Sequence, residues 1–301
     1  MKLDIYKNEY NLYLDARNLL YEKYSEDKVP QIIAIYLTGS RYTGLQNDNS
    51  DYDFYVVYMP SKYQLYKGKN ESFSKTIETC RQEDGKSVNL EFKFIDTRTY
   101  IQMIQKSDIH GLEMLWAFED QVLFAKPEDL SLRALKLQRQ LAYKLWNNYK
   151  ARLLNPKNFK KSMEGMIRSY WKDAYKLFNN GDYEKCLKYV ANGERLTNIL
   201  RRYGKNPYVI FMYDKLAYSE KNIDISTLCE DKRNNDISNL EEHMERFQCD
   251  IEDLNSDNSL KDFYLLMDYN FLDRKWKKNI KSHRRKLEDP FINILLEGYN
   301  I

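Results

Sequence analysis

An uninterrupted apolar run near the N-terminus is the feature that most restricts the fold of this chain. Residues 31–37 (QIIAIYL) have the length of one strand, and their apolarity is continuous rather than alternating. A strand with this pattern is typically buried on both faces of a sheet. The run stops at Gly39, and a second strand is predicted at residues 52–58. The sequence therefore predicts a sheet whose central strands are covered on both sides.

The rest of the first half alternates between predicted strands and helices. Residues 87–95 alternate strictly, with Val88, Leu90 and Phe92 on one face, which is typical of a half-buried strand. The other predicted elements are a helix at 3–24, a weak helix at 73–82, a helix that starts at 96–99 and carries Tyr100, a helix at 112–118 and a short strand at 122–124.

The second half has a different pattern. Apolar stripes at helical spacing occupy residues 132–149 and 163–175, and strand-like runs nearly vanish. We place the boundary near Lys126–Pro127, which gives a domain at 1–126 and a helical domain at 127–301. The order predicts an α+β fold, with a mixed sheet flanked by helices and then an all-α domain.

Composition excludes several classes of protein. The chain is 43% hydrophobic and 31% charged, with a net charge of +3, which excludes a membrane protein, a collagen-like chain and a disordered tail. The N-terminus has no apolar signal-peptide region, and no long apolar run follows. The four cysteines are isolated, so neither a zinc site nor a disulfide framework is expected. We expect a soluble, cytoplasmic protein with no membrane partner.

The segment between the two strands carries the residues for chemistry. Gly39 ends the first strand, where a missing Cβ lets a ligand approach the backbone, and Ser40 lies where a helix would begin. Asp51 and Asp53 are two residues apart and project from the same face of a strand. Two adjacent carboxylates need a bridging cation, and Mg²⁺ often shares its ligands with substrate phosphates. This arrangement predicts metal-dependent phosphoryl or nucleotidyl transfer.

The same segment resembles a known family. Its pattern, G-S-x-x-x-G-L followed by S-D-x-D, is similar to that of the DNA polymerase β-like nucleotidyltransferase superfamily. The matching residues are Gly39, Ser40, Gly44, Ser50, Asp51 and Asp53. The residues within this motif resemble those of a branch of predicted nucleotidyltransferases associated with RNA repair in bacteria and large phages.

The branch implies a third carboxylate on a later strand. Glu91 occupies that place, although the branch usually has Asp, and Tyr100 and the Leu-Glu-x-Leu helix at 112–115 follow as expected. An alternative is that Glu91 is an exposed strand residue paired with Lys93 or with a neighbouring strand. Asp96 is a rival ligand, but it fits better as the residue that starts a helix.

The helical half shows a weaker resemblance to the same branch. The branch often carries Lys-x-x-x-His-x-x-Arg, and this chain has Lys188, Asn192 and Arg195, with Asn in place of His. These positions share one helix face and would line the cleft together. The alternative is a solvated helix face.

The resemblance also implies a mechanism. Asp51 and Asp53 would hold Mg²⁺ (or Mn²⁺) on the triphosphate of an NTP substrate, and Glu91 would complete a second metal site or act as general base. The β- and γ-phosphates would be bound by Gly39, Ser40 and Arg41, while Lys188 and Arg195, with Asn192 beside them, would neutralise the leaving pyrophosphate.

The acceptor is the least determined part of the prediction. The branch implies an RNA 3′ end, plausibly tRNA, and residues 274–286 (RKWKKNIKSHRRK) carry eight basic residues and no acid. That run is also consistent with a plain solvated helix. A protein or small-molecule acceptor is the alternative enzyme function. A catalytically inactive relative that binds RNA or a protein is a further alternative, against which the intact Asp51–Asp53 pair argues.

Overall fold

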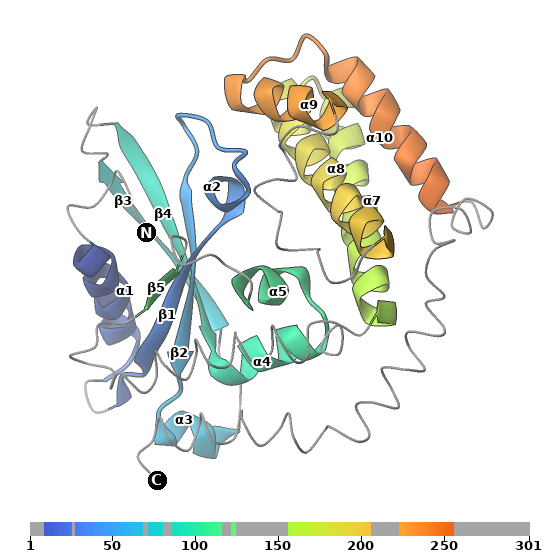
Figure 1. Cartoon of the computed structure of the whole chain (residues 1–301). Helices are drawn as coiled ribbons and strands as arrows, with labels where there is room; N and C mark the ends of the chain where they lie inside the picture. The colour runs from blue at the N-terminus through green and yellow to red at the C-terminus, as the bar shows by residue number, and fades with distance from the viewer. Residues whose placement is uncertain are drawn as a thin grey trace.

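The computed structural model describes residues 9–25, 28–68, 72–80, 86–115, 122–124, 156–205 and 223–255. The described strands form a five-stranded sheet in the order β3-β4-β2-β1-β5 (Figure 1). Their bounds are β1 Gln31–Thr38, β2 Tyr52–Met59, β3 Ser72–Cys80, β4 Ser87–Asp96 and β5 Val122–Phe124. The β2–β4 pair is parallel and the others are antiparallel. The predicted α+β class with a mixed sheet is confirmed.

Helices cover both faces of this sheet, as the continuous apolarity of residues 31–37 predicted. Figure 1 shows α1 (Glu9–Lys23) on one side and α4 (Thr97–Gln105) with α5 (Ile109–Leu115) on the other. Under α1 the core is aromatic, with Phe54 and Phe92 stacked at 5.3 Å between ring centroids and both fully buried. Each such ring stabilises the fold by about 2 kcal/mol.

The weak helix predicted at residues 73–82 is wrong over its described part, because residues 73–80 belong to strand β3. It pairs antiparallel with β4, and Phe73 stacks on Phe94 with 4.5 Å between ring centroids. The β-branched residues Thr76 and Ile77 also favour a strand. The strand lies at the sheet edge with most of its side chains exposed, so its sequence lacks the apolar alternation that would have identified it.

The described helices of the second half form a bundle. They are α7 (Pro156–Asn179), α8 (Tyr183–Lys205), α9 (Ile223–Asn234) and α10 (Leu240–Asn255). The buried cluster of this bundle also takes in Leu45, Ile109 and Leu112 from the first half of the chain. The bundle therefore packs directly against the sheet domain. The domain boundary near Lys126–Pro127 and the stripe at 132–149 lie outside the described residues.

Two further findings concern the described residues as a whole. None of their helices combines the length and apolarity needed to cross a bilayer. The basic run at residues 274–286 lies outside the described ranges, so its predicted contact with RNA stays a prediction.

Candidate active site

The turn from β1 into α2 (Gly39–Thr43) forms the floor of the site. Gly39 has φ +67, in the left-handed region that favours glycine, and a Cβ there would lie 2.0 Å from Oδ2 of Asp53. The hydroxyl of Thr38 donates to the carbonyl oxygen of Asp53 at 3.2 Å. The glycine predicted to allow a close backbone approach therefore lies directly against the Asp53 carboxylate.

Asp53 and Glu91 form the acidic centre. They are register partners on the parallel strands β2 and β4, so their carboxyl groups lie side by side and the charge of Glu91 acts on Asp53. Burial raises the pKa of Asp53, and the charge of Glu91 raises it further, whereas the charges of Lys93 and Lys188 lower it. Two carboxyl groups this close repel each other when both are ionised, and a cation between them would remove that repulsion.

Glu91 has a second partner on its own strand. Lys93 Nζ lies 3.6 Å from Glu91 Oε1, so the ion pair named as the alternative for Glu91 is present together with the contact to Asp53. The rival ligand Asp96 is fully buried and caps α4, accepting from the backbone N–H of Thr99 at 2.8 Å and pairing with Arg98 at 2.7 Å. Asp96 thus starts a helix, as its position predicted.

Asp51 stands apart from this pair. It is exposed and immediately precedes β2. Across the described residues no three His, Cys, Asp or Glu side chains are gathered closely enough to hold a metal ion together. The structure thus brings Asp53 and Glu91 together and leaves Asp51 at the rim of the site, two residues from Asp53.

Arg41 supports the loop that leads to Asp51. Its guanidinium lies 3.6 Å from the centre of the Tyr52 ring and donates to the carbonyl oxygen of Ser50 at 2.9 Å. Ser50 in turn closes a tight turn with Asn47, whose backbone N–H donates to the Ser50 hydroxyl at 2.9 Å. In this arrangement Arg41 positions the Asp51 loop, whereas the sequence predicted that it would bind phosphate.

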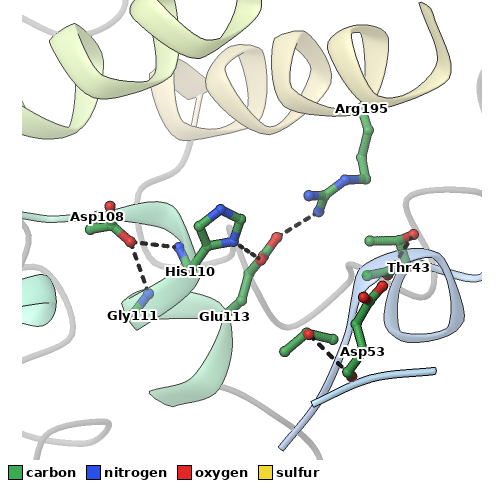
Figure 2. A network of polar contacts seen from close by, with 9 residues as sticks. Thr43, Asp53, Asp108, His110, Gly111, Glu113 and Arg195 are labelled. Carbon is green, nitrogen blue, oxygen red and sulfur yellow. Dashed lines mark hydrogen bonds and ion pairs between the residues drawn. The ribbon is translucent and has the colours of Figure 1, made fainter. Parts of the chain in front are cut away.

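The three residues predicted on α8 have different surroundings. Lys188 is exposed, and its charge acts on Asp53. Asn192 donates to the carbonyl oxygen of Lys188 on its own helix at 2.9 Å. Arg195 is buried and pairs with Glu113 of α5 at 2.8 Å (Figure 2). A contact of Arg195 with pyrophosphate would therefore require this buried ion pair to open.

The Arg195–Glu113 pair belongs to a network that sequence reasoning missed. His110 Nδ1 lies 3.5 Å from Glu113 Oε2, and Asp108 accepts from the backbone N–H groups of His110 and Gly111 (Figure 2). Burial alone would raise the pKa of Glu113, but the charges of Arg195 and His110 lower it overall. The one signal in the sequence was the His110–Glu113 spacing, which places both side chains on one helix face.

The network reaches the acidic centre through Tyr55, which lies two residues after Asp53 on β2. Its ring centroid is 6.1 Å from that of His110. Burial, with the charges of nearby carboxylates, raises the pKa of Tyr55 to about 12. Tyr55 therefore keeps its proton near neutral pH.

The end of α9 connects the helical bundle to the loop at residues 39–44, which we call the glycine loop. Arg233 Nε donates to the carbonyl oxygen of Gly44 at 2.8 Å, and Asn47 Nδ2 donates to Asn235 Oδ1 at 3.1 Å. These contacts join segments far apart in the sequence, and no local pattern predicted them. They place the helical bundle over one side of the site.

The residues of this site fall within a known sequence-family model. The family model described as a nucleotidyltransferase domain matches residues 21–109, which include the glycine loop, both aspartates and Glu91. A crystal structure of a nucleotidyltransferase-like protein from Exiguobacterium sibiricum 255-15 is 13% identical, with a TM-score of 0.31 over 93% of this chain and 90% of that one. No curated protein sequence matches this chain. Over residues 21–109 the chain is thus similar to nucleotidyltransferase domains, which supports the DNA polymerase β-like superfamily that the glycine and aspartate spacing predicted.

Proposed function

We propose that this protein transfers a nucleoside monophosphate from an NTP to an acceptor hydroxyl in a metal-dependent reaction. The observation that carries the proposal is the Asp53–Glu91 carboxyl pair on adjacent parallel strands, packed against Gly39 at the end of β1. The acceptor oxygen attacks the α-phosphorus, the bond to the β-phosphate oxygen breaks, and pyrophosphate leaves.

The carboxylates fit a hard divalent cation. Asp53 and Glu91 are register partners on adjacent strands, and Asp51 at the rim adds a further carboxylate to the set of oxygen ligands that Mg²⁺ or Mn²⁺ prefers. When bound, the cation neutralises charge on the triphosphate and on the attacking oxygen. Glu91 takes the proton of the acceptor hydroxyl, a role open to a half-exposed carboxylate beside the reacting atoms.

The phosphates occupy the space between the glycine loop and α8. The backbone N–H groups at Gly39 and Ser40 face the β- and γ-phosphates, and Lys188 neutralises the leaving pyrophosphate. Arg41 and Arg195 act as positioning residues, because Arg41 holds the Ser50 carbonyl and Arg195 holds Glu113. Asn192 supports the same turn of α8 through its bond to the Lys188 carbonyl oxygen.

The acceptor we favour is an RNA 3′ end, plausibly that of tRNA. Support comes from the resemblance of the G-S and S-D-x-D motifs to those of the RNA-repair branch, and from the basic run at residues 274–286. A protein or a small molecule would be the acceptor if that run does not contact RNA.

One experiment separates these acceptors. The protein is incubated with labelled NTPs, Mg²⁺ and either total RNA or cell lysate. We expect label on RNA, none after EDTA addition, and none with the Asp51→Ala/Asp53→Ala variant. The matched control is Asp48→Ala, which removes an exposed acidic residue from the same loop. Label on a protein or metabolite would replace the RNA acceptor, and no label on any acceptor would overturn the transferase proposal.

A further inference from the structure

The sheet face that carries Asp53 and Glu91 stays open for one further pair of residues. Tyr55 and Lys93 are register partners two residues further along β2 and β4, and they project from the same face as the two carboxylates. All four side chains are partly exposed, whereas the next register pair on this face is buried. An open floor therefore extends from the carboxyl pair to Tyr55 and Lys93 and ends there.

His110 of α5 stands beside this floor. Its ring centroid lies 6.1 Å from that of Tyr55, and its side chain is 43% exposed. Figure 2 shows it on α5, in the same view as the strand that carries Asp53. His110 Nδ1 lies 3.5 Å from Glu113 Oε2, and among the described residues Nε2 forms no hydrogen bond or ion pair. Glu113 thus holds one ring nitrogen of His110, and the other is available to a ligand.

The groups around His110 favour its charged form. Burial lowers the pKa of His110, but the carboxylates of Glu113 and Asp108 raise it overall, while the charge of Arg195 on α8 opposes them. From β2 it is faced by the ring of Tyr55, whose hydroxyl keeps its proton near neutral pH. His110 therefore stays protonated to a higher pH than an ordinary histidine.

The floor thus has an acidic end and a basic end. Asp53 and Glu91 form the acidic end, and about 7 Å along the strands lie Lys93, from β4, and His110, from α5. Lys93 pairs with Glu91 at 3.6 Å but is still 39% exposed. The last nucleotide of a nucleic acid chain has two matching ends, because its ribose joins the 3′ hydroxyl to a phosphate on the 5′ side. A hydroxyl on a protein or on an uncharged sugar lacks that phosphate.

We propose that His110 is an acceptor-binding residue whose imidazolium, together with Lys93, binds the phosphate on the 5′ side of the last nucleotide of the acceptor. The inference rests on the proposed function and deepens it, because it assigns the acceptor to nucleic acid chains. Glu113 holds the imidazole, and Arg195 holds Glu113 at 2.8 Å. The buried ion pair is then the support of the acceptor site.

The test measures binding without turnover. A short oligoribonucleotide with a 3′ hydroxyl is titrated into the protein with Mg²⁺ and no NTP, and so is the same oligonucleotide with an uncharged methylphosphonate in place of its last phosphodiester. His110→Gln removes the charge of the side chain, and His110→Lys keeps it. Lys106→Gln is the matched control, because it removes an exposed cation four residues earlier in the chain. ATP binding and thermal unfolding are measured for each protein.

We expect the original chain to bind the phosphodiester about tenfold more tightly than the methylphosphonate, since hydrogen bonds between charged groups are the strong ones. This preference should disappear in His110→Gln, persist in Lys106→Gln and largely persist in His110→Lys. As pH rises through the raised pKa of His110, the preference of the original chain should shrink, because the imidazolium loses its proton, whereas that of His110→Lys should not. ATP affinity should be the same in all four proteins.

The contrary outcomes are distinct. An equal preference in the original chain and in His110→Gln, or no oligonucleotide binding at all, overturns the acceptor site even if nucleotide transfer is observed. Equal weakening of both oligonucleotides with a lower melting temperature means that His110 only supports the fold, and weaker ATP binding in His110→Gln means that it contacts the NTP; either result overturns the acceptor site. A preference that depends on His110, in a protein that transfers no nucleotide, keeps the phosphate contact and overturns the proposed function.

Discussion

The two sides of the candidate site are built in different ways. The sheet wall, which we define as Gly39, Asp53 and Glu91, consists of residues on one loop and two paired strands, and it is acidic. The helical wall, defined as Lys188 and Arg195, comes from α8 and carries basic side chains. One wall offers oxygen ligands for a cation, and the other offers positive charge for an anion.

The difference lies in what holds each wall in place. Backbone register places Asp53 beside Glu91, so the sheet wall forms whenever β2 and β4 pair correctly. The helical wall depends on tertiary contacts instead, chiefly the buried Arg195–Glu113 ion pair and the Arg233–Gly44 hydrogen bond. We therefore expect sheet-wall substitutions to change chemistry with little loss of stability, and substitutions at Arg195 to do the reverse.

The largest effect is expected from Asp53 of the sheet wall together with Asp51 at the rim of the site. Asp51→Ala/Asp53→Ala removes two carboxylates that would hold the cation, so transfer should fall by about 10³-fold or more, as when an essential electrostatic group is lost. Neither residue belongs to a buried cluster, so circular dichroism and melting temperature should stay close to those of the original chain. Near-normal transfer in this variant, or in excess EDTA, would remove the metal from the mechanism.

The helical wall should respond through stability. Arg195→Ala removes the guanidinium partner of the buried Glu113 carboxylate and leaves only His110 beside it, and breaking a buried ion pair in this way costs about 3–5 kcal/mol of unfolding free energy. Because the pKa of Glu113 is lowered in the folded state, this contribution exists at neutral pH and disappears as pH falls through the acidic range. Denaturant unfolding at pH 7 measures the loss.

A double variant sharpens this prediction. Arg195→Met/Glu113→Leu removes both charges and should be less destabilised than Arg195→Ala, because no carboxylate is left unpaired. If both variants lose the same free energy, the cost comes from packing, and the ion pair does not hold the helical wall.

The sequence predicted the sheet wall better than the helical wall, and the reason is physical. The apolar run at residues 31–37, the glycine that ends it and the alternation at 87–95 are local patterns, and each strand formed where its pattern indicated. Strand β3 was missed because an edge strand buries few side chains and so carries a weak pattern.

The helical wall could not be predicted to the same extent. The spacing of Lys188, Asn192 and Arg195 correctly indicated one helix, but spacing cannot tell which side chain is taken by a partner from another element. Arg195 pairs with Glu113 and Arg41 holds the Ser50 carbonyl, and both partners are set by packing.

A smaller effect on chemistry is expected at Glu91. Glu91→Gln keeps the size of the side chain and removes its charge, so kcat should fall about 10²-fold, the lower range for a general base. The matched control is Asp96→Asn, which alters the buried helix cap and should lower the melting temperature while leaving the pH profile of kcat unchanged. A drop in kcat confined to Asp96→Asn would transfer the role to Asp96.

The smallest effect concerns a buried carboxyl pair behind the helical wall. Glu194, next to Arg195 on α8, is 2% exposed, and the charge of Asp250 on α10 acts on it. Burial, and then the charge of Asp250, raise the pKa of Glu194 to about 7, while Arg246 and Arg201 oppose the shift. The folded chain therefore keeps a proton on this pair that the unfolded chain releases at lower pH.

This sign predicts how stability depends on pH. Between pH 5 and pH 8 the unfolded chain has already lost the Glu194 proton, whereas the folded chain still has to release it. The unfolding free energy should therefore fall by about 1–3 kcal/mol as pH rises through this range. Glu194→Gln keeps the hydrogen-bonding shape without the titration and should flatten that part of the profile. Glu184→Gln, an exposed position on the same helix, should leave the profile unchanged. An equal slope in the unsubstituted protein and in Glu194→Gln would mean that the Glu194–Asp250 pair does not cause the pH dependence of stability.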